Sequence, residues 1–230
     1  MRYFFRIIFL SLLMVFHLTY ADVQLQSGLM MPVAKNIQPF ALQRYVANPA
    51  PGQSKVQPFT NDNLKGQWTL LFFGFTNCPA LCPTTMAQLA NAYQTLQQQN
   101  FTPMPQVVFV SIDPERDTLT KVNTFATTFN PNFMGTRTDD MKTLGVMTHE
   151  MNAMFEKVVQ PASITGDKDT SSTYTINHTG DIMVLSPQGQ FVAMLTMPHQ
   201  ASDIVADYQT IVKNAAPNQL SGLWGWLKQL

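Results

Sequence analysis

Two cysteines lie close together in this chain of 230 residues, and they are the only two it has. Cys78 and Cys82 stand in the stretch FGFTNCPALCPTTM with three residues between them, and each is followed by a proline. Three kinds of chemistry fit such a pair: a structural disulfide, a redox-active dithiol, and two ligands for a soft metal ion. The elements that position the two thiols help to choose among these three.

The cysteines are predicted to lie between a buried strand and a helix. The run WTLLFFGF (68–75) is apolar throughout, as expected of a strand covered on both faces. After the cysteines, apolar residues recur at helical spacing, with Pro83 as the expected first helical residue and Cys82 at the N-cap. The positive end of the helix dipole lowers a thiol pKa, which favours the thiolate needed for metal binding or disulfide exchange.

The spacing of the cysteines argues against two of the three chemistries. A disulfide here would close a very short loop, so it would stabilise the fold little. Redox dithiols at such a junction have two intervening residues, whereas three stand here, which weakens a purely redox interpretation. Two thiolates suit a soft cation, and Cu(I) is the obvious candidate outside the cytosol. Two sulfurs leave a metal site open, so a third ligand is expected.

Four histidines are available as that third ligand. His17 lies in the apolar N-terminal segment, His149 in a less regular stretch suited to a surface role, and His199 beside Pro198, where exposure is expected. His178 directly precedes a predicted hairpin, at a point expected to face the cysteine junction in the fold that the order of elements indicates, as described next. His178 is therefore the candidate third ligand.

The remaining pattern predicts the other elements of the domain. A second buried strand is expected at 107–112 and an amphipathic helix at 119–129, with Asp117 placed to cap it. Residues 135–159 suggest a short helix and then a strand, and 160–173 form a polar loop. A hairpin is predicted around the turn SPQG (186–189), and a last helix, capped by Ser202, ends before Pro217. This order indicates an α/β protein with a thioredoxin-like fold: a central mixed sheet flanked by helices, with a terminal β-hairpin and a C-terminal helix.

Four segments are expected along the chain. Residues 1–21 have a cationic start and an apolar core, as in a signal peptide or an N-terminal membrane anchor. Residues 22–54 contain several prolines and are predicted to be irregular. The thioredoxin-like domain is placed at 55–215, and residues 216–230 form an amphipathic tail that docks on the domain or lies at a membrane interface. An exported protein of this kind would lie in the periplasm or be anchored in the inner membrane facing it.

The composition is balanced in charge. Acidic and basic residues are equal in number, charged residues make up 12% of the chain, and hydrophobic residues make up 45%. No basic stripe with interleaved aromatic residues is present, so the sequence offers nothing for a nucleic-acid partner. The hydrophobic content is ample for one buried core.

The sequence resembles the Sco/SenC family of copper chaperones for cytochrome oxidase assembly. The resemblance is carried by FGFTNCPALCPTTM, by VFVSIDPERDT (108–118) and by His178, and it covers about residues 55–215. It implies that Cys78, Cys82 and His178 bind Cu(I) or Cu(II). It also implies a supporting role for Asp113 in copper transfer or redox steps, against the alternative of a turn residue. Asn77 and Asn177 depart from the family pattern, but neither position would supply a ligand.

Two functions follow from this resemblance. The first is a metallochaperone, not an enzyme in the turnover sense, that delivers copper to the copper site of a respiratory cytochrome c oxidase subunit or another copper enzyme. A copper donor protein would load it. The second is a thiol–disulfide oxidoreductase that reduces the copper-ligand cysteines of its client. In that case Cys78 and Cys82 would be the catalytic dithiol, with Cys78 as the attacking sulfur, and His178 would be dispensable.

Overall fold

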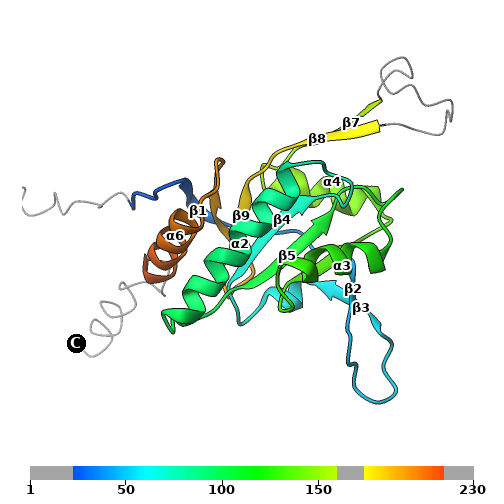
Figure 1. Cartoon of the computed structure of the whole chain (residues 1–230), viewed down its shortest axis with the longest axis horizontal. Helices are drawn as coiled ribbons and strands as arrows, with labels where there is room; N and C mark the ends of the chain where they lie inside the picture. Colours follow the sequence, from blue (N-terminus) through cyan, green and yellow to red (C-terminus); the bar gives the residue numbers. More distant parts are fainter. Residues whose placement is uncertain (1–22, 160–173, 215–230) are drawn as a thin grey trace, which may run out of the picture.

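A computed structural model describes residues 23–159 and 174–214 of the chain (Figure 1). The strands are β1 (Gly28–Asn36), β2 (Ala41–Tyr45), β3 (Val56–Thr60), β4 (Thr69–Gly74), β5 (Gln106–Ser111), β6 (Met134–Arg137), β7 (Phe155–Val159), β8 (Tyr174–His178), β9 (Ile182–Leu185) and β10 (Gln190–Leu195). The helices are the short 3-10 helix η1 (Asn61–Leu64) and the α-helices α2 (Leu81–Gln98), α3 (Leu119–Phe129), α4 (Met141–Glu150) and α6 (Ala201–Asn214).

Eight strands form one mixed sheet in the order β1-β10-β9-β4-β5-β6-β2-β3. Strands β4, β5 and β6 are parallel, and β9 joins β4 in antiparallel register. All six residues of β4 are buried, as are five of the six in β5, which explains their uninterrupted apolar sequences. Helices α2 and α6 lie side by side over the sheet (Figure 1). The predicted mixed sheet with flanking helices is confirmed.

The terminal hairpin is also confirmed, as strands β9 and β10. The turn between them is closed by a hydrogen bond from the Gly189 amide to the Ser186 carbonyl, 2.8 Å long. Gly189 has a φ of +77°, in the left-handed region where a side chain would be strained. Ser186 and Gly189 therefore close the turn, as the SPQG stretch predicts.

The prediction that residues 22–54 are irregular is wrong for residues 28–36 and 41–45, which form strands β1 and β2. Strand β1 pairs with β10 at one edge of the sheet, and β2 pairs with β6 near the other. Strands β1 and β3 are the two edges of the sheet, where a proline can lack its backbone N–H without breaking the ladder. Pro32 lies where the register of β1 shifts, and Pro58 lies on β3. No residue of β1 and only one residue of β3 is buried, so these strands lack the apolar pattern that marks a buried strand.

Two helix caps differ from those predicted. Thr118, not Asp117, caps α3, because the Thr118 hydroxyl accepts a hydrogen bond from the Lys121 amide. Helix α6 begins at Ala201, so Ser202 lies inside its first turn. The Ala201 amide instead donates to the side chain of Gln88 on α2, at 2.9 Å. A polar side chain from a neighbouring helix thus replaces the local cap.

A second, separate sheet consists of β7 and β8 alone, paired antiparallel. In Figure 1 this hairpin extends away from one end of the main sheet. The predicted loop 160–173, the N-terminal segment and the tail 216–230 lie outside the described residues. Among the residues described, no helix is both long and apolar enough to cross a membrane.

Candidate metal centre

The two cysteines lie where β4 gives way to α2. Cys82 is the second residue of α2 and is fully buried, whereas Cys78, in the preceding loop, is half-buried. The helix begins slightly earlier than predicted, with Ala80 at its N-cap and no side-chain cap. The Cys82 amide donates instead to the Cys78 sulfur, at 3.3 Å. The Cys78 sulfur therefore sits at the positive end of the helix, the place that the sequence assigned to Cys82.

Gly74, the last residue of β4, makes room for the buried sulfur. A Cβ atom at this position would lie 2.8 Å from the Cys82 Sγ and 2.7 Å from a ring carbon of Phe109. Both distances are too short for any side chain to fit without movement. The glycine ahead of the cysteines thus has a packing reason that the sequence alone did not reveal.

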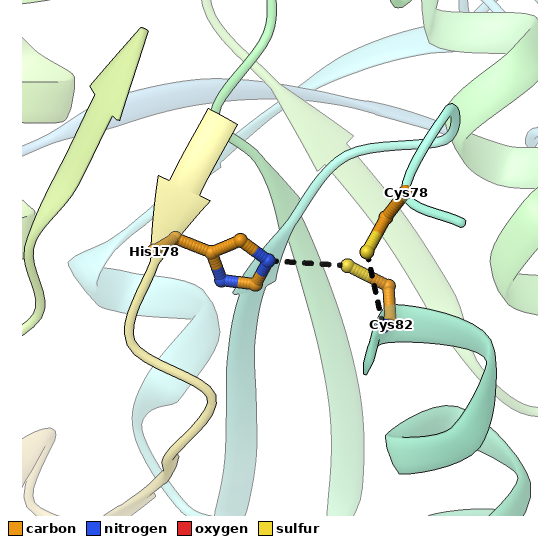
Figure 2. Close-up of side chains that lie close together, drawn as sticks. All are labelled: Cys78, Cys82 and His178. Carbon is orange, nitrogen blue, oxygen red and sulfur yellow. Dashed lines mark hydrogen bonds between the residues drawn. The ribbon is translucent and has the colours of Figure 1, made fainter. Parts of the chain in front are cut away.

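His178 ends β8 and points at the dithiol, as Figure 2 shows. Its Nε2 lies 3.4 Å from the Cys82 Sγ, and its Nδ1 lies 2.8 Å from the carbonyl oxygen of Thr179. A carbonyl only accepts, so this contact assigns the proton to Nδ1 and leaves the Nε2 lone pair facing the sulfurs. The rings of Phe75 and Phe72 pack against the imidazole, with centroids 5.8 and 6.1 Å away.

The three side chains form one group of donors. The two sulfurs and one ring nitrogen all lie within 4.8 Å of one another, close enough to share a metal ion. No other set of three or more His, Cys, Asp or Glu side chains in the described part of the chain does so. The residues that the sequence singled out are thus brought together by β4, α2 and β8.

The two thiols titrate very differently. A hydrogen bond from the Cys82 thiol lowers the pKa of Cys78 to about 4; backbone N–H groups add to this effect, against partial burial. The same bond, followed by burial, raises the pKa of Cys82 well above its ordinary range. The metal-free pair is therefore a thiolate at the surface and a protonated thiol beneath it.

A cavity of about 590 Å³ lies beside His178. Its lining includes His149 from the last turn of α4, the exposed Met154, and Asn177 and His178 from β8. His149 is exposed, as expected, and it does not belong to the donor group. His199 is half-buried, contrary to the expected exposure, because its Nε2 lies 2.7 Å from the Gly180 carbonyl oxygen.

Asp113 is not a ligand in this arrangement. It is buried, accepts a hydrogen bond from the Tyr174 hydroxyl at 2.5 Å, and forms an ion pair with Arg116 at 2.5 Å. Asp117 is buried as well and accepts from the Ser111 hydroxyl and from Thr76. Sequence reasoning missed Arg116 and Tyr174, because only the folded chain places them against Asp113.

This chain is similar in sequence and in fold to known proteins. A sequence model described as SCO1/SenC matches residues 53–213. The mitochondrial SCO2 homologue of mouse is 28% identical over 151 residues, which are 66% of this chain and 56% of that protein. The copper-bound structure of ScoI from Arabidopsis thaliana has 27% identity and a TM-score of 0.62, covering 76% of this chain and 97% of that one. The apo Sco1 structure from Thermus thermophilus has 28% identity and a TM-score of 0.60, covering 80% and 95%.

Proposed function

The chain belongs to the SCO1/SenC family, and we propose that it is a copper chaperone that delivers copper to the copper site of a respiratory cytochrome c oxidase. Sco proteins are a family of cytochrome c oxidase assembly proteins. The observation that carries the proposal is the convergence of Cys78, Cys82 and His178, with all three donor atoms within 4.8 Å. The matched region spans little more than half of the mouse relative, so the activity and partners of the whole protein belong to the proposal.

The donor set fits copper in both of its oxidation states. Two thiolates are soft ligands that suit Cu(I), and an imidazole nitrogen suits Cu(II). The Thr179 carbonyl fixes the tautomer that turns Nε2 toward the sulfurs. Cys78 and Cys82 would therefore hold copper in either state, and His178 would matter most for Cu(II).

The unequal burial of the donors suits a cargo that must be passed on. Cys78 is half-buried, so an incoming thiolate or imidazole of a partner can reach the ion from its side. Cys82 is buried, so it would be the last ligand to be exchanged. We further infer that this exchange takes place outside the cytosol, in the periplasm or at the inner membrane facing it. The signal-like N-terminal segment supports this location.

One observation favours a second function, reduction of the client's own cysteines. The low pKa of Cys78, caused first by the hydrogen bond from Cys82, makes it a thiolate at neutral pH. It would attack a client disulfide, forming a mixed disulfide and releasing one client thiolate. Cys82 would then lose its proton and attack the Cys78 sulfur, releasing the second client thiol. The client gains two electrons, and the Cys78–Cys82 pair becomes a disulfide.

Copper titration of the reduced chain separates the two functions. We expect one tight equivalent of copper in the wild type, loss of tight Cu(I) binding in Cys82→Ser, and damaged Cu(II) binding in His178→Ala. The chaperone proposal fails if His178→Ala binds both copper states like the wild type while disulfide reduction needs only the cysteines.

A further inference from the structure

The strand that carries His178 is not part of the main sheet. Among the described residues, strand β8 pairs only with β7, so no ladder of backbone hydrogen bonds there fixes it to β4, where the dithiol begins. The imidazole must nevertheless reach the sulfurs to complete the site. Only the short connection 179–181 ties the end of β8 to β9 in the main sheet, so further contacts must hold the rest of the hairpin. The structure shows a concentrated group of them at Tyr174, the first residue of β8.

Tyr174 is bound to the loop after β5 through both its side chain and its backbone. Its hydroxyl donates to the Asp113 Oδ1 at 2.5 Å, and its carbonyl oxygen accepts from the Arg116 Nη1 at 2.8 Å. Arg116 in turn donates through Nε to the Asp113 Oδ2 at 2.5 Å. These three residues close a ring of hydrogen bonds, in which the aspartate is only 2% exposed.

The arginine also lies between aromatic rings that lead to the histidine. Its guanidinium carbon is 3.6 Å from the centroid of the Tyr174 ring and 5.7 Å from that of Phe75. Phe75 packs edge-on against the imidazole of His178. The buried Arg116 Nη2 has no hydrogen-bond partner within the described residues, so the guanidinium is held there by its other nitrogens and by the rings.

A neighbouring carboxylate, that of Asp117, contacts the loop that carries Cys78. Asp117 accepts hydrogen bonds from the Thr76 amide and hydroxyl, at 3.0 and 2.5 Å, two residues before Cys78. The loop 112–118 therefore contacts both the dithiol loop and the hairpin, through two different carboxylates. Asp113 serves the histidine side and Asp117 the cysteine side.

Resting on the proposed copper function, we propose that Asp113, Arg116 and Tyr174 are positioning residues for His178. Together they hold β8 so that the imidazole meets the dithiol. None of them contacts the donor atoms, so their loss leaves both thiols in place. The consequence is selective, because Cu(II) needs the imidazole whereas Cu(I) is held by the sulfurs.

Tyr174→Phe tests this directly, because it removes only the hydroxyl and keeps the ring that packs on Arg116. We expect the dissociation constant for Cu(II) to rise about 10-fold, as for other groups that orient a metal-binding histidine, while Cu(I) affinity stays unchanged. In the metal-free chain, backbone hydrogen exchange should become faster in β7 and β8 than in β4 and β5.

Tyr208→Phe is the matched control. Tyr208 lies on α6, outside the donor group, and is also buried. Its hydroxyl donates to the Pro103 carbonyl at 2.8 Å. It should leave both copper affinities and hairpin exchange as in the wild type. The proposal is overturned if Tyr174→Phe binds Cu(II) like the wild type, if both affinities fall together, or if Tyr208→Phe has the same effect. Failure of the wild type to bind copper would instead refute the proposed function.

Discussion

The two halves of the donor group are held in different ways. The dithiol lies at the junction of β4 and α2, in the middle of an eight-stranded sheet, with Cys82 fully buried. His178 lies on a two-stranded hairpin outside that sheet and depends on side-chain contacts for its position. Changes near the cysteines should therefore act on the fold and on both copper states. Changes near the hairpin should act on the histidine-dependent state alone.

The largest expected effect concerns the difference between the thiols themselves. Because the hydrogen bond from Cys82 is the main cause of the low Cys78 pKa, Cys82→Ala should return that pKa toward its ordinary value. At pH 7 the thiolate fraction would fall roughly 30-fold, given an ordinary cysteine pKa of about 8.5. Alkylation of Cys78 by iodoacetamide measures this change.

The sign of the pH dependence follows from the same values. Above a pKa of about 4 the wild-type Cys78 is already a thiolate, so its alkylation rate should stay flat across neutral pH. In Cys82→Ala the rate should rise with pH through the neutral range. A rising wild-type rate would contradict the proposed coupling of the two thiols.

The next-largest effect is expected at Gly74, which packs against the buried Cys82. Gly74→Ala would place a Cβ 2.8 Å from the Cys82 Sγ, so we expect a loss of about 1–3 kcal/mol in the free energy of unfolding. Urea denaturation of the metal-free chain gives this value. Both copper affinities should fall with it, because the buried sulfur must move.

Gly145→Ala is the matched control for that substitution. Gly145 lies within α4, and nothing stands within 4 Å of where its Cβ would be. An alanine there should stabilise the helix by about 0.5–1 kcal/mol. Equal destabilisation by both alanines would show that Gly74 has no special packing role.

Asp117→Asn is the counterpart, on the cysteine side, of the change at Tyr174. An amide keeps the shape of the side chain but has only one oxygen to accept the hydrogen bonds from Ser111 and Thr76. We expect a loss of about 1 kcal/mol of stability and weaker binding of both copper states. A selective loss of Cu(II) binding would remove the distinction between the two carboxylates.

The smallest effect is expected for an exposed ion pair at the β7–β8 hairpin. Lys157 on β7 pairs with Glu115 at 2.6 Å, but both side chains are well exposed to solvent. Such pairs contribute about 0–1 kcal/mol, so Glu115→Gln should leave stability and both copper affinities nearly unchanged. A large loss of Cu(II) affinity in this variant would mean that this ion pair, rather than Tyr174, positions the hairpin.

The sequence predicted the parts that depend on local pattern and on fold order. The buried strands, the hairpin turn and the convergence of Cys78, Cys82 and His178 follow from apolar runs and from the thioredoxin-like sequence of elements. Strands β1, β2 and β3 were missed, because β1 has no buried residue and β2 and β3 have one each, so no apolar run or alternation marks them.

Contacts between distant segments account for the rest. Asp117 stands just before a helix, where a capping residue is expected. Its carboxylate instead accepts a hydrogen bond from the Thr76 amide, 41 residues away, and is buried. The hydrogen bond between Tyr174 and Asp113 joins residues 61 positions apart, so no local sequence pattern predicts it. Side chains that orient a site in this way become visible only once the chain is folded.

X-ray absorption spectroscopy of the copper-loaded chain identifies the atoms that bind copper. For Cu(I) we expect two sulfur donors, and for Cu(II) we expect the same two sulfurs with one imidazole nitrogen. The nitrogen should disappear in His178→Ala, and its signal should weaken in Tyr174→Phe but not in Tyr208→Phe. A Cu(II) site without an imidazole, or one whose imidazole survives the loss of His178, would contradict the assignment of these ligands.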